Sequence, residues 1–487
     1  MNILANLYLW IKGKFTEEPK SLLVHNTSIS EILPYPVPEQ YKNISMKDLN
    51  GSYAYPGFID THTHSFEGGL YSLGVDLSTA KNIEDILALL SEANSKKTKD
   101  EFIFAWQMDE TLLKERRFPT LTELNSAVPD KPLILRRIDG HSCMLNSYAR
   151  NMVTGLKTKE EILRGGENDY AVHFFHKRLN DEAILNAYRA AANIGLQAGF
   201  TSLHTMIGDA ENSINHYELI RDNLNKFPLR FILYPQSFNI KAALEAGANR
   251  IGGCILADGS IGSETAAISE PYLNSNSWGV LYQSDEFWQK FITEASQHRL
   301  QVAIHCIGDR AIRQINNVYK SLASTADLRH QLIHCEITPD NLIEEIATSG
   351  AVPVMQPNFD YLWGGENGFY AKKIGIKRSR IMNRFATLLK SGITITGGSD
   401  WYITSLNAAH SLRAAINHHN PLERLSTAQA IDIYTKNAAW LNSEEDTYGK
   451  IKIGYKADLS IYSHPIENET TELYYLIRDG EIKYAAI

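Results

Sequence analysis

The sequence predicts an α/β protein, namely a TIM-like (β/α)8 barrel that carries an insertion and a small β-sandwich domain formed by the N- and C-terminal segments. The first observation is that strand-like and helix-like segments alternate from about Pro56 to about Asn442, as expected for a parallel sheet connected by helices. The second is that both ends of the chain consist of short apolar runs between turn residues, which is typical of strands. The third is the length of 487 residues, which exceeds one ordinary core and suits a large barrel with a satellite domain.

The two termini are predicted to build one domain together. The strand-like runs are ANLYLWI, SLLVHN and ISEILPYP near the start, and ADLSIYS, LYYLIRDG and EIKYAAI near the end. Because a few strands cannot bury their apolar face alone, we expect the two ends to pair. The predicted domains are therefore a composite β-sandwich of residues 1–55 plus 443–487 and a barrel of residues 56–442.

The central segment contains ten strand candidates, which is more than a (β/α)8 barrel needs. They are FIDTHTH, FIFAWQM, LILRRID, TSLHTM, LRFILYP, CILADG, QVAIHC, HQLIHC, VPVMQP and TITGGSD. The surplus predicts an insertion within about residues 100–180, where the stretch KTKEEILRGGENDYAVHFF is polar and weakly periodic. A doubly wound sheet is the rival architecture, but its G-x-G-x-x-G phosphate loop is missing.

Composition limits the classes of function. Hydrophobic residues make up 44% and charged residues 21% of the chain, which excludes wholesale disorder. The net charge of −8 argues against a nucleic-acid scaffold, which would show a basic face. Four cysteines are too few for a disulfide framework, and no apolar run approaches the ~20 residues that cross a bilayer. We therefore expect a cytoplasmic protein with a small-molecule substrate, no nucleic-acid partner and no membrane partner, and with a homodimer as the commonest oligomeric state.

The clearest local signal is the segment PGFIDTHTHS, which places His62 and His64 at the end of an apolar strand. Because side chains two residues apart on a strand share a face, both imidazoles point the same way. Neutral imidazoles are ligands for borderline metals such as Zn²⁺. An H-x-H pair alone is equally consistent with one exposed histidine and one that only contacts a ligand.

Three further strand candidates end in residues that bind metals. His305 closes QVAIH, His334 closes HQLIH and Asp400 closes TITGGSD. The carboxyl ends of consecutive parallel strands lie at one edge, where barrel enzymes hold their active site. One histidine after a buried strand is usually structural, but five metal-type residues at four strand ends predict a shared metal site.

The order H-x-H, His, His, Asp, together with the ending GKIKIGYKADLSIY, resembles the amidohydrolase superfamily of metal-dependent hydrolases. Longer motifs narrow the resemblance to its amidohydrolase-3, or YtcJ-like, branch. They are LRRIDGHSCMLNS (135–147), ILADGSIGSETAAISEPY (255–272) and VAIHCIGDRAI (302–312). The resemblance covers essentially the whole chain.

The resemblance implies a metal-dependent hydrolase that cleaves the C–N bond of an amide, N-formyl or cyclic amide small molecule with a metal-activated water. It implies that His62, His64, His305 and His334 hold one or two divalent ions, most simply Zn²⁺, and that Asp400 binds metal or its water and shuttles the proton. Both steps agree with the general chemistry of such sites. Two alternatives stay open, namely a metal-dependent deaminase of a small aromatic amine and a non-catalytic barrel that retains metal.

Two positions depart from the family pattern. Cys254 stands where related enzymes often carry a lysine, and no lysine lies nearby on that strand. This departure favours one metal ion over a bridged pair, with Cys254 either a thiolate ligand or a small buried thiol. Glu264 stands where an arginine is usual. In the pocket, Glu264 would favour a neutral or cationic substrate, whereas on the surface it would have no such effect.

Further residues are candidates for the substrate pocket. His141 could act catalytically by donating a hydrogen bond to the substrate carbonyl or oxyanion, or it could close the insertion onto the barrel. Asp258 and Asp309 could orient ligand imidazoles or cap helices. Asp258, Trp106 and Glu264 are the residues predicted to bind substrate. The remaining candidates for lining the pocket are Asp139, His204, Trp363 and Trp401.

Overall fold

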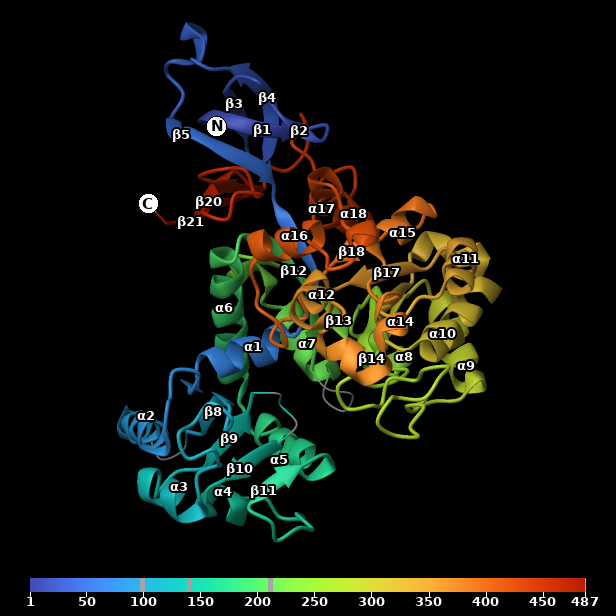
Figure 1. Cartoon of the computed structure of the whole chain (residues 1–487). Coiled ribbons are helices and arrows are strands. Elements are labelled where there is room, and N and C mark those ends of the chain that lie inside the picture. The colour runs from blue at the N-terminus through green and yellow to red at the C-terminus, as the bar shows by residue number, and fades with distance from the viewer. Residues whose placement is uncertain (97–100, 139, 141, 209–212, 487) are drawn as a thin grey trace. The chain divides into compact units, whose positions relative to one another are not determined.

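The computed structural model describes residues 1–96, 101–138, 140, 142–208 and 213–486 (Figure 1). By its internal contacts the chain divides into two compact units. Unit 1 comprises Met1–Ser65 and Ala192–Ile487, and unit 2 comprises Phe66–Ala191. Each unit has its own sheets and its own apolar core.

The terminal segments of unit 1 form one eight-stranded sheet in the order β21-β20-β19-β5-β1-β3-β4, with β2 paired to β1. Its strands are β1 (Asn2–Ile11), β2 (Lys14–Phe15), β3 (Lys20–His25), β4 (Ser28–Pro34), β5 (Met46–Pro56), β19 (Leu459–Tyr462), β20 (Leu473–Arg478) and β21 (Glu481–Ala485). Strand β5 joins the two ends of the chain, because it pairs with β1 in parallel and with β19 in antiparallel orientation. Leu7, Leu22 and Ile461 share one buried cluster. A two-layered sandwich stays a prediction.

Eight parallel strands occupy the rest of unit 1. They are β6 (Phe58–Thr63), β12 (Phe200–Ile207), β13 (Arg230–Pro235), β14 (Arg250–Leu256), β15 (Gln301–Cys306), β16 (Gln331–His334), β17 (Val352–Met355) and β18 (Thr396–Gly397). They hydrogen-bond as two arcs, β13-β12-β6 and β14-β15-β16-β17-β18. The Asp400 N–H donates to the His62 carbonyl and the His64 N–H to the Trp401 carbonyl, so backbone hydrogen bonds connect the ends of β6 and β18.

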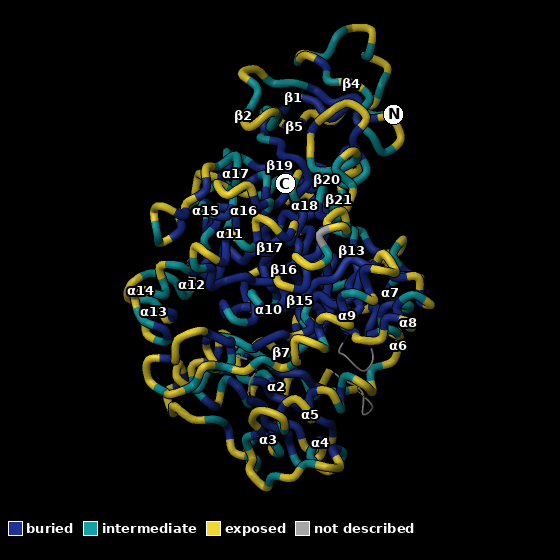
Figure 2. Tube along the Cα trace, turned by 90° about the vertical axis from the view of Figure 1, so that its right-hand side faces the viewer, coloured by how far each residue is buried: buried dark blue, intermediate teal, exposed yellow. Residues whose placement is uncertain are grey.

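The parallel strands of unit 1 are buried on both faces. Every residue of β6, β12, β15, β16, β17 and β18 is buried, and Figure 2 shows β15, β16 and β17 within the dark-blue interior. Burial on both faces is typical of parallel strands covered by helices, and here β6 and β12 also bury polar residues such as Asp60 and His204. The predicted α/β class is confirmed.

Two of the ten predicted strands belong to unit 2. The runs FIFAWQM and LILRRID form β8 (Ile103–Met108) and β9 (Leu133–Arg137). They lie in a five-stranded sheet of order β11-β10-β9-β8-β7, completed by β7 (Val75–Asp76), β10 (Ser142–Leu145) and β11 (Ile162–Arg164). The remaining eight candidates are the eight parallel strands of unit 1.

Helices follow most of the parallel strands of unit 1. They are α7 (Ser213–Arg221), α8 (Ile240–Glu245), α9 (Asp285–Gln297), α10 (Asp309–Ser321), α11 (Asp340–Ser349), α12 (Pro357–Trp363), α13 (Phe369–Ile374), α14 (Ile376–Ser379), α15 (Phe385–Lys390), α16 (Ala408–Ile416), α17 (Thr427–Ile433) and α18 (Lys436–Leu441). Helix α10 buries Ile312, Ile315 and Tyr319 along one side, which is the helical spacing of an apolar stripe.

Unit 2 contains the helices that surround its own sheet. They are α1 (Ser65–Ser72), α2 (Ile83–Lys96), α3 (Leu121–Ala127), α4 (Ser147–Met152), α5 (Gly166–His176) and α6 (Asp181–Gln197), of which α1 begins and α6 ends in unit 1. Thr120 and Glu123 form a capping box at the start of α3, which satisfies two backbone donors of the first turn. Ile86, Leu90 and Leu135 pack in the core of this unit.

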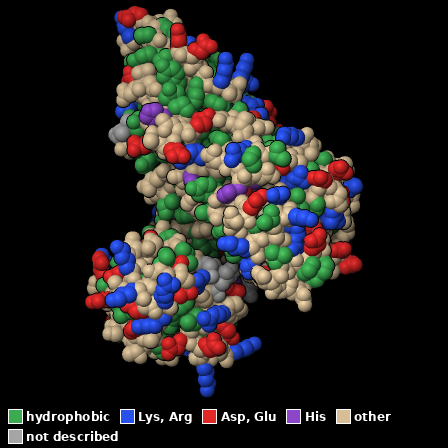
Figure 3. Space-filling model, viewed as in Figure 1, with side chains coloured by type: hydrophobic (Ala, Val, Ile, Leu, Met, Phe, Trp, Pro, Cys, Tyr) green, Lys and Arg blue, Asp and Glu red, His purple; other side chains and the backbone are tan. Residues whose placement is uncertain are grey.

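Charged side chains of both signs are interspersed over the molecular face drawn in Figure 3. Neither the Lys and Arg side chains nor the Asp and Glu side chains gather into one broad field on that face. Among the residues that the structure describes, no helix has both the length and the apolar character needed to span a membrane.

Candidate metal centre

The metal-type residues predicted for unit 1 lie at the carboxyl ends of its parallel strands. His62 is in β6 and His64 follows that strand directly. His305 and His334 lie at the ends of β15 and β16, and Asp400 follows β18. Parallel strands bring these ends to one edge of the sheet, so residues that are far apart in the chain become neighbours.

Asp400 contacts both histidines of the H-x-H pair. Its Oδ1 lies 3.2 Å from Nε2 of His62 and 3.2 Å from Nε2 of His64. The two imidazole rings are perpendicular, with centroids 5.4 Å apart. One carboxylate oxygen therefore faces two imidazole nitrogens, so the three side chains can share one cation.

The other two histidines complete the cluster. The His334 ring lies 5.3 Å from the His62 ring and 4.5 Å from the His305 ring. The side chain of His62 is fully buried, whereas that of His64 is 16% exposed. The cluster is thus enclosed on the side of His62 and reaches solvent at His64.

Cys254 also belongs to this cluster. Its Sγ and the ring nitrogens of His62 and His64 lie within 4.8 Å of one another, and the thiol contacts the His334 side chain as well. The sequence left open whether Cys254 is a metal ligand or a small buried thiol. In the structure its side chain faces the histidines. The sequence indicated a role at the site through the position of Cys254 on the strand before ADG, where the amidohydrolase pattern often has a lysine.

Two buried polar side chains lie beside the imidazoles of β15 and β16. Nδ1 of His334 lies 2.8 Å from Oε1 of Gln356, and Nδ1 of His305 lies 3.6 Å from Oδ1 of Asp258. Backbone N–H groups of Ala267, Ile307 and Gly308 donate to the two oxygens of Asp258. The Gln356 acceptor holds the His334 ring and leaves its Nε2 for a ligand. The orienting role of Asp258 stays a prediction, because Nδ1 of His305 lies beyond hydrogen-bond distance of it. Gln356 was not among the residues predicted from the sequence.

Asp60 holds the ends of β6 and β18 together. It accepts hydrogen bonds from the backbone N–H groups of His62 and Ser399. Its complete burial raises its pKa to about 7 in spite of these hydrogen bonds. A Cβ atom on Gly398 would lie 2.8 Å from Cβ of His62, so only glycine permits this close approach.

The backbone at two cluster residues is unusual. His334 has a φ of 71° and Asp400 a φ of 56°, which is uncommon for residues other than glycine. Such conformations cost free energy and concentrate at functional sites, where surrounding contacts hold them in place.

Electrostatics within the cluster favour an anionic Asp400. Burial alone would raise its pKa, but the contacts with His62 and His64 outweigh burial and lower the pKa below its usual range. Burial likewise opposes the charged form of His62 and His64, yet contacts with Asp400 and Cys254 raise the pKa of both imidazoles. Metal ligation requires neutral imidazoles, so protons and a metal ion compete for the same nitrogens.

The residues of the cluster fit a divalent cation. Both ring nitrogens of His62, Nδ1 of His305 and Oδ1 of Asp400 are buried without a hydrogen-bond partner among the described residues. Each such atom costs about 1–3 kcal/mol if nothing satisfies it. Imidazole nitrogen, carboxylate oxygen and thiolate sulfur are ligands of zinc-class ions.

The remaining predicted pocket residues lie in different environments. The Glu264 carboxylate lies 2.7 Å from the Lys373 ammonium and accepts a hydrogen bond from Ser275, so its charge is compensated. Trp106 lies in β8 of unit 2, where its ring stacks on Tyr71 at 6.2 Å. Asp139 and His141, which the sequence predicted to belong to the pocket, lie outside the described residues.

The other candidates of unit 1 are mostly buried. The His204 ring contacts the Tyr234 hydroxyl at 3.1 Å, and burial lowers the His204 pKa well below its usual range. Asp309 accepts a hydrogen bond from the Ser269 N–H. Trp401 is 9% exposed, and Trp363 packs on Phe359 with ring centroids 4.7 Å apart.

An aromatic side chain that the sequence did not single out contacts the cluster. The Phe359 ring of α12 stacks on the His334 ring at 5.6 Å with an interplanar angle of 12°. The Tyr402 ring lies 6.2 Å from the His64 ring. Because Trp363 extends the Phe359 contact, the cluster has an aromatic wall that an apolar substrate group could contact.

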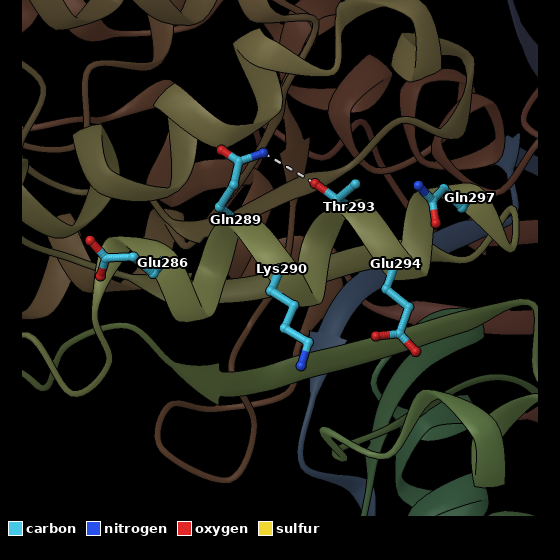
Figure 4. A pocket seen from close by; sticks show the side chains of 6 residues that line it. All are labelled: Glu286, Gln289, Lys290, Thr293, Glu294 and Gln297. Carbon is cyan, nitrogen blue, oxygen red and sulfur yellow. Dashed lines mark hydrogen bonds between the residues drawn. The ribbon is translucent and has the colours of Figure 1, made fainter.

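A separate hollow lies along the surface of α9. It is lined by the polar residues Glu286, Gln289, Lys290, Thr293, Glu294 and Gln297. Figure 4 shows all six projecting from one helix, with Gln289 donating a hydrogen bond to Thr293. These residues include no histidine or cysteine, and this hollow adds nothing to the metal cluster.

Comparisons with known proteins agree with the geometry. The family model described as the amidohydrolase family matches residues 46–484. The chain is 27% identical over 491 residues to YtcJ of Bacillus subtilis (strain 168), provisionally named an amidohydrolase, covering 90% of each protein. It is 22% identical over 508 residues to an N-substituted formamide deformylase of Arthrobacter pascens, covering 90% of this chain and 89% of the relative. A solved structure of an uncharacterized metal-dependent hydrolase from Pyrococcus furiosus has a TM-score of 0.82 at 22% identity, covering 96% of this chain and 100% of that chain.

Proposed function

Because this chain belongs to the amidohydrolase family, we propose that it is a metal-dependent hydrolase that cleaves the C–N bond of a small amide, N-formyl or cyclic amide compound. The observation that carries the proposal is the contact of one Asp400 oxygen with both His62 and His64, inside a cluster that also contains His305 and His334. A carboxylate among four imidazoles can hold a cation and move a proton in the same place.

We interpret the eight parallel strands of unit 1 as a (β/α)8 barrel. The hydrogen bonds between the ends of β6 and β18 support closure, and barrel enzymes hold their active sites at the carboxyl ends of the strands. The cluster has that position. The described part of the chain therefore offers a rigid platform for the reaction.

The four imidazoles and Asp400 would hold a Zn²⁺-class ion. When bound, the ion lowers the pKa of water and polarises the substrate carbonyl. Asp400 would accept a proton from the attacking water and deliver it to the leaving nitrogen as the C–N bond breaks. One water is consumed. An N-formyl or N-acyl amine gives a carboxylic acid and an amine, whereas a cyclic amide opens to one product that carries both groups.

We expect N-formyl amines to be the best starting substrates. The relative from Arthrobacter pascens is named for the deformylation of N-substituted formamides, which supports this order of testing. The aromatic wall formed by Phe359, Trp363 and Tyr402 supports an apolar substituent on the nitrogen, since buried aromatic rings bind apolar groups.

The test is a panel of N-formyl amines, N-acyl amines and cyclic amides, with release of the amine as the readout. We expect hydrolysis by the Zn²⁺-loaded protein, loss on chelation and recovery when Zn²⁺ is restored. Turnover that persists after the metal has been removed, as checked by elemental analysis, contradicts the proposal. Release of ammonia from an aromatic amine, without hydrolysis of any amide, would support the deaminase alternative instead.

A further inference from the structure

The metal cluster contains one residue type that the proposed hydrolytic mechanism does not use, the thiol of Cys254. Its Sγ lies in a group with ring nitrogens of His62 and His64 whose members are within 4.8 Å of one another. The thiol also contacts His334. The thiol therefore faces three imidazoles, while the residue also packs against a buried apolar cluster that contains Met206, Tyr234 and Ala303.

The backbone of β14 carries Cys254 toward the histidines. Gly252 pairs with Ala303 and Ile255 with Ile304, so two residues of β14, one of them Cys254, stand between consecutive pairing positions of β15. Extra residues of this kind form a β-bulge, which re-aims a side chain and is frequent next to active sites. A bulge compensates for the short stem of cysteine.

Two glycines make this bulge possible. Gly252 and Gly253 have φ values of 95° and 94°, a conformation that favours glycine. A Cβ atom would lie 2.2 Å from the Ala303 carbonyl oxygen at position 252 and 2.1 Å from Met206 Sδ at position 253. The glycine pair therefore has a structural reason directly before Cys254.

The histidines beside the thiol are only partly satisfied, since the Asp400 carboxylate contacts His62 and His64, and Gln356 contacts His334. Both ring nitrogens of His62 are buried without a hydrogen bond among the described residues, and the His62 side chain has no solvent exposure. A neutral thiol donates at most one weak hydrogen bond and cannot satisfy three imidazoles. A cation at this point satisfies the nitrogens and the sulfur together.

We propose that Cys254 is a thiolate ligand of the ion held by His62 and His64, an inference that rests on the proposed metal-dependent function and specifies its metal centre. Ligation replaces the S–H bond by a sulfur–metal bond and releases one proton to solvent. Because thiolate is a soft ligand, the centre takes Zn²⁺, Co²⁺ or Cd²⁺ in preference to Mg²⁺ or Mn²⁺.

The decisive measurement is X-ray absorption spectroscopy of the Zn²⁺-loaded wild-type protein. We expect one sulfur neighbour at about 2.3 Å in addition to nitrogen and oxygen neighbours at about 2.0–2.1 Å. The Co²⁺-loaded protein should show a thiolate-to-metal charge-transfer band in the near ultraviolet. Neither signal depends on turnover.

Variants separate the thiolate from the other ligands. In Cys254→Ser the charge-transfer band is lost and Zn²⁺ affinity falls by about 10–100-fold, as for other partners of a metal site. Cys254→Asp keeps a ligand atom, so it should retain the ion but lose the sulfur neighbour. The matched control is Cys143→Ser, a buried cysteine in β10 of unit 2, which should keep the band and the affinity.

The outcomes distinguish this inference from the proposed function. A bound ion with nitrogen and oxygen neighbours only, or a band that survives in Cys254→Ser, overturns the thiolate ligand even if amides are hydrolysed. A sulfur neighbour without hydrolysis of any C–N substrate overturns the proposed function and leaves the ligand standing. A wild-type protein that binds no divalent ion at all overturns both.

Discussion

Asp400 is the residue whose replacement separates proton transfer from ion binding. Asparagine keeps the size and one oxygen of the side chain but cannot accept the proton of water. We predict that Asp400→Asn lowers kcat by about 10²–10⁴-fold while four imidazoles still hold the ion. Steady-state kinetics and elemental analysis on the same sample check this. The control is Asp340→Asn in α11, whose side chain is 85% exposed, and full turnover by Asp400→Asn would refute the role.

Gln356 contacts the cluster through His334, so we expect it to affect a bound ion only through that imidazole. Its Oε1 lies 2.8 Å from Nδ1 of that imidazole, and its amide donates to the Val354 carbonyl. We predict that Gln356→Leu lowers Zn²⁺ affinity by about 10–100-fold, because the ring loses the acceptor that orients it. Competition titration with a chromophoric chelator measures the effect. Gln356→Glu retains an acceptor and should recover most of the affinity, whereas unchanged affinity in Gln356→Leu would exclude a positioning role.

At the scale of single elements, the bulge in β14 depends on glycine. Alanine at position 253 places Cβ 2.1 Å from Met206 Sδ at a φ of 94°. We predict that Gly253→Ala lowers the free energy of unfolding by about 1–3 kcal/mol through overpacking, and that it weakens Zn²⁺ binding. Gly392→Ala is the control, because Gly392 has a φ of 79° but no atom within 4 Å of its Cβ position. If both variants lose the same amount of unfolding free energy, backbone strain alone accounts for the effect and overpacking against Met206 does not contribute.

The segment that leads into β19 contains a carboxylate that is costly to ionise. Asp458 accepts a hydrogen bond from the Asp479 N–H, yet its burial raises its pKa from 3.8 to about 6. A raised folded-state pKa means that this group contributes stability below about pH 4, and that the contribution is lost as pH rises through about 6. We predict that Asp458→Asn, which keeps the acceptor, is more stable than wild type above pH 6 by on the order of 2 kcal/mol. Urea unfolding at about pH 5 and about pH 8 checks this, and an advantage independent of pH would count against it.

The elements of the site were only partly predictable. The strands that end in His305, His334 and Asp400 could be recognised because each is a short apolar run with a metal-type residue at its carboxyl end. The contacts of Gln356 and Phe359 could not, because they depend on the path of the chain between β17 and α12. A glycine pair inside an apolar run indicates a bulge or a turn equally well, so the approach of the thiol to the histidines also required the structure.

At the scale of the whole molecule, sequence periodicity was least informative about which sheet a strand joins. The ten apolar runs look alike, and eight of them form the parallel strands of unit 1, whereas β8 and β9 belong to unit 2. Local patterns record burial, but partner choice depends on contacts between distant segments. The pairing of the two chain ends through β5 was predictable because both ends consist of short strand-like runs that flank one long α/β segment.

Every described residue of the metal cluster lies in unit 1, which predicts where bound metal stabilises the chain. His62, Cys254, His305, His334 and Asp400 belong to that unit. An ion that binds only the folded state stabilises it by about 2.7 kcal/mol at a free concentration of 100 Kd, which is about a 100-fold change in the opening equilibrium. We predict that Zn²⁺ slows hydrogen exchange of peptides from β6, β14 and β16 to a similar extent and leaves β8–β10 unchanged.

The control for this experiment is a protein in which both His62 and His64 are replaced by alanine, which should show the same exchange with and without Zn²⁺. The six cluster residues, His64 included, come from segments between positions 62 and 400. An ion that links them therefore opposes separation of strands that are far apart in the chain. Protection limited to β6 would mean that the H-x-H pair binds the ion alone. Equal protection of β8–β10 would mean that the ion acts on both units, and the cluster of unit 1 would then not account for the stabilisation.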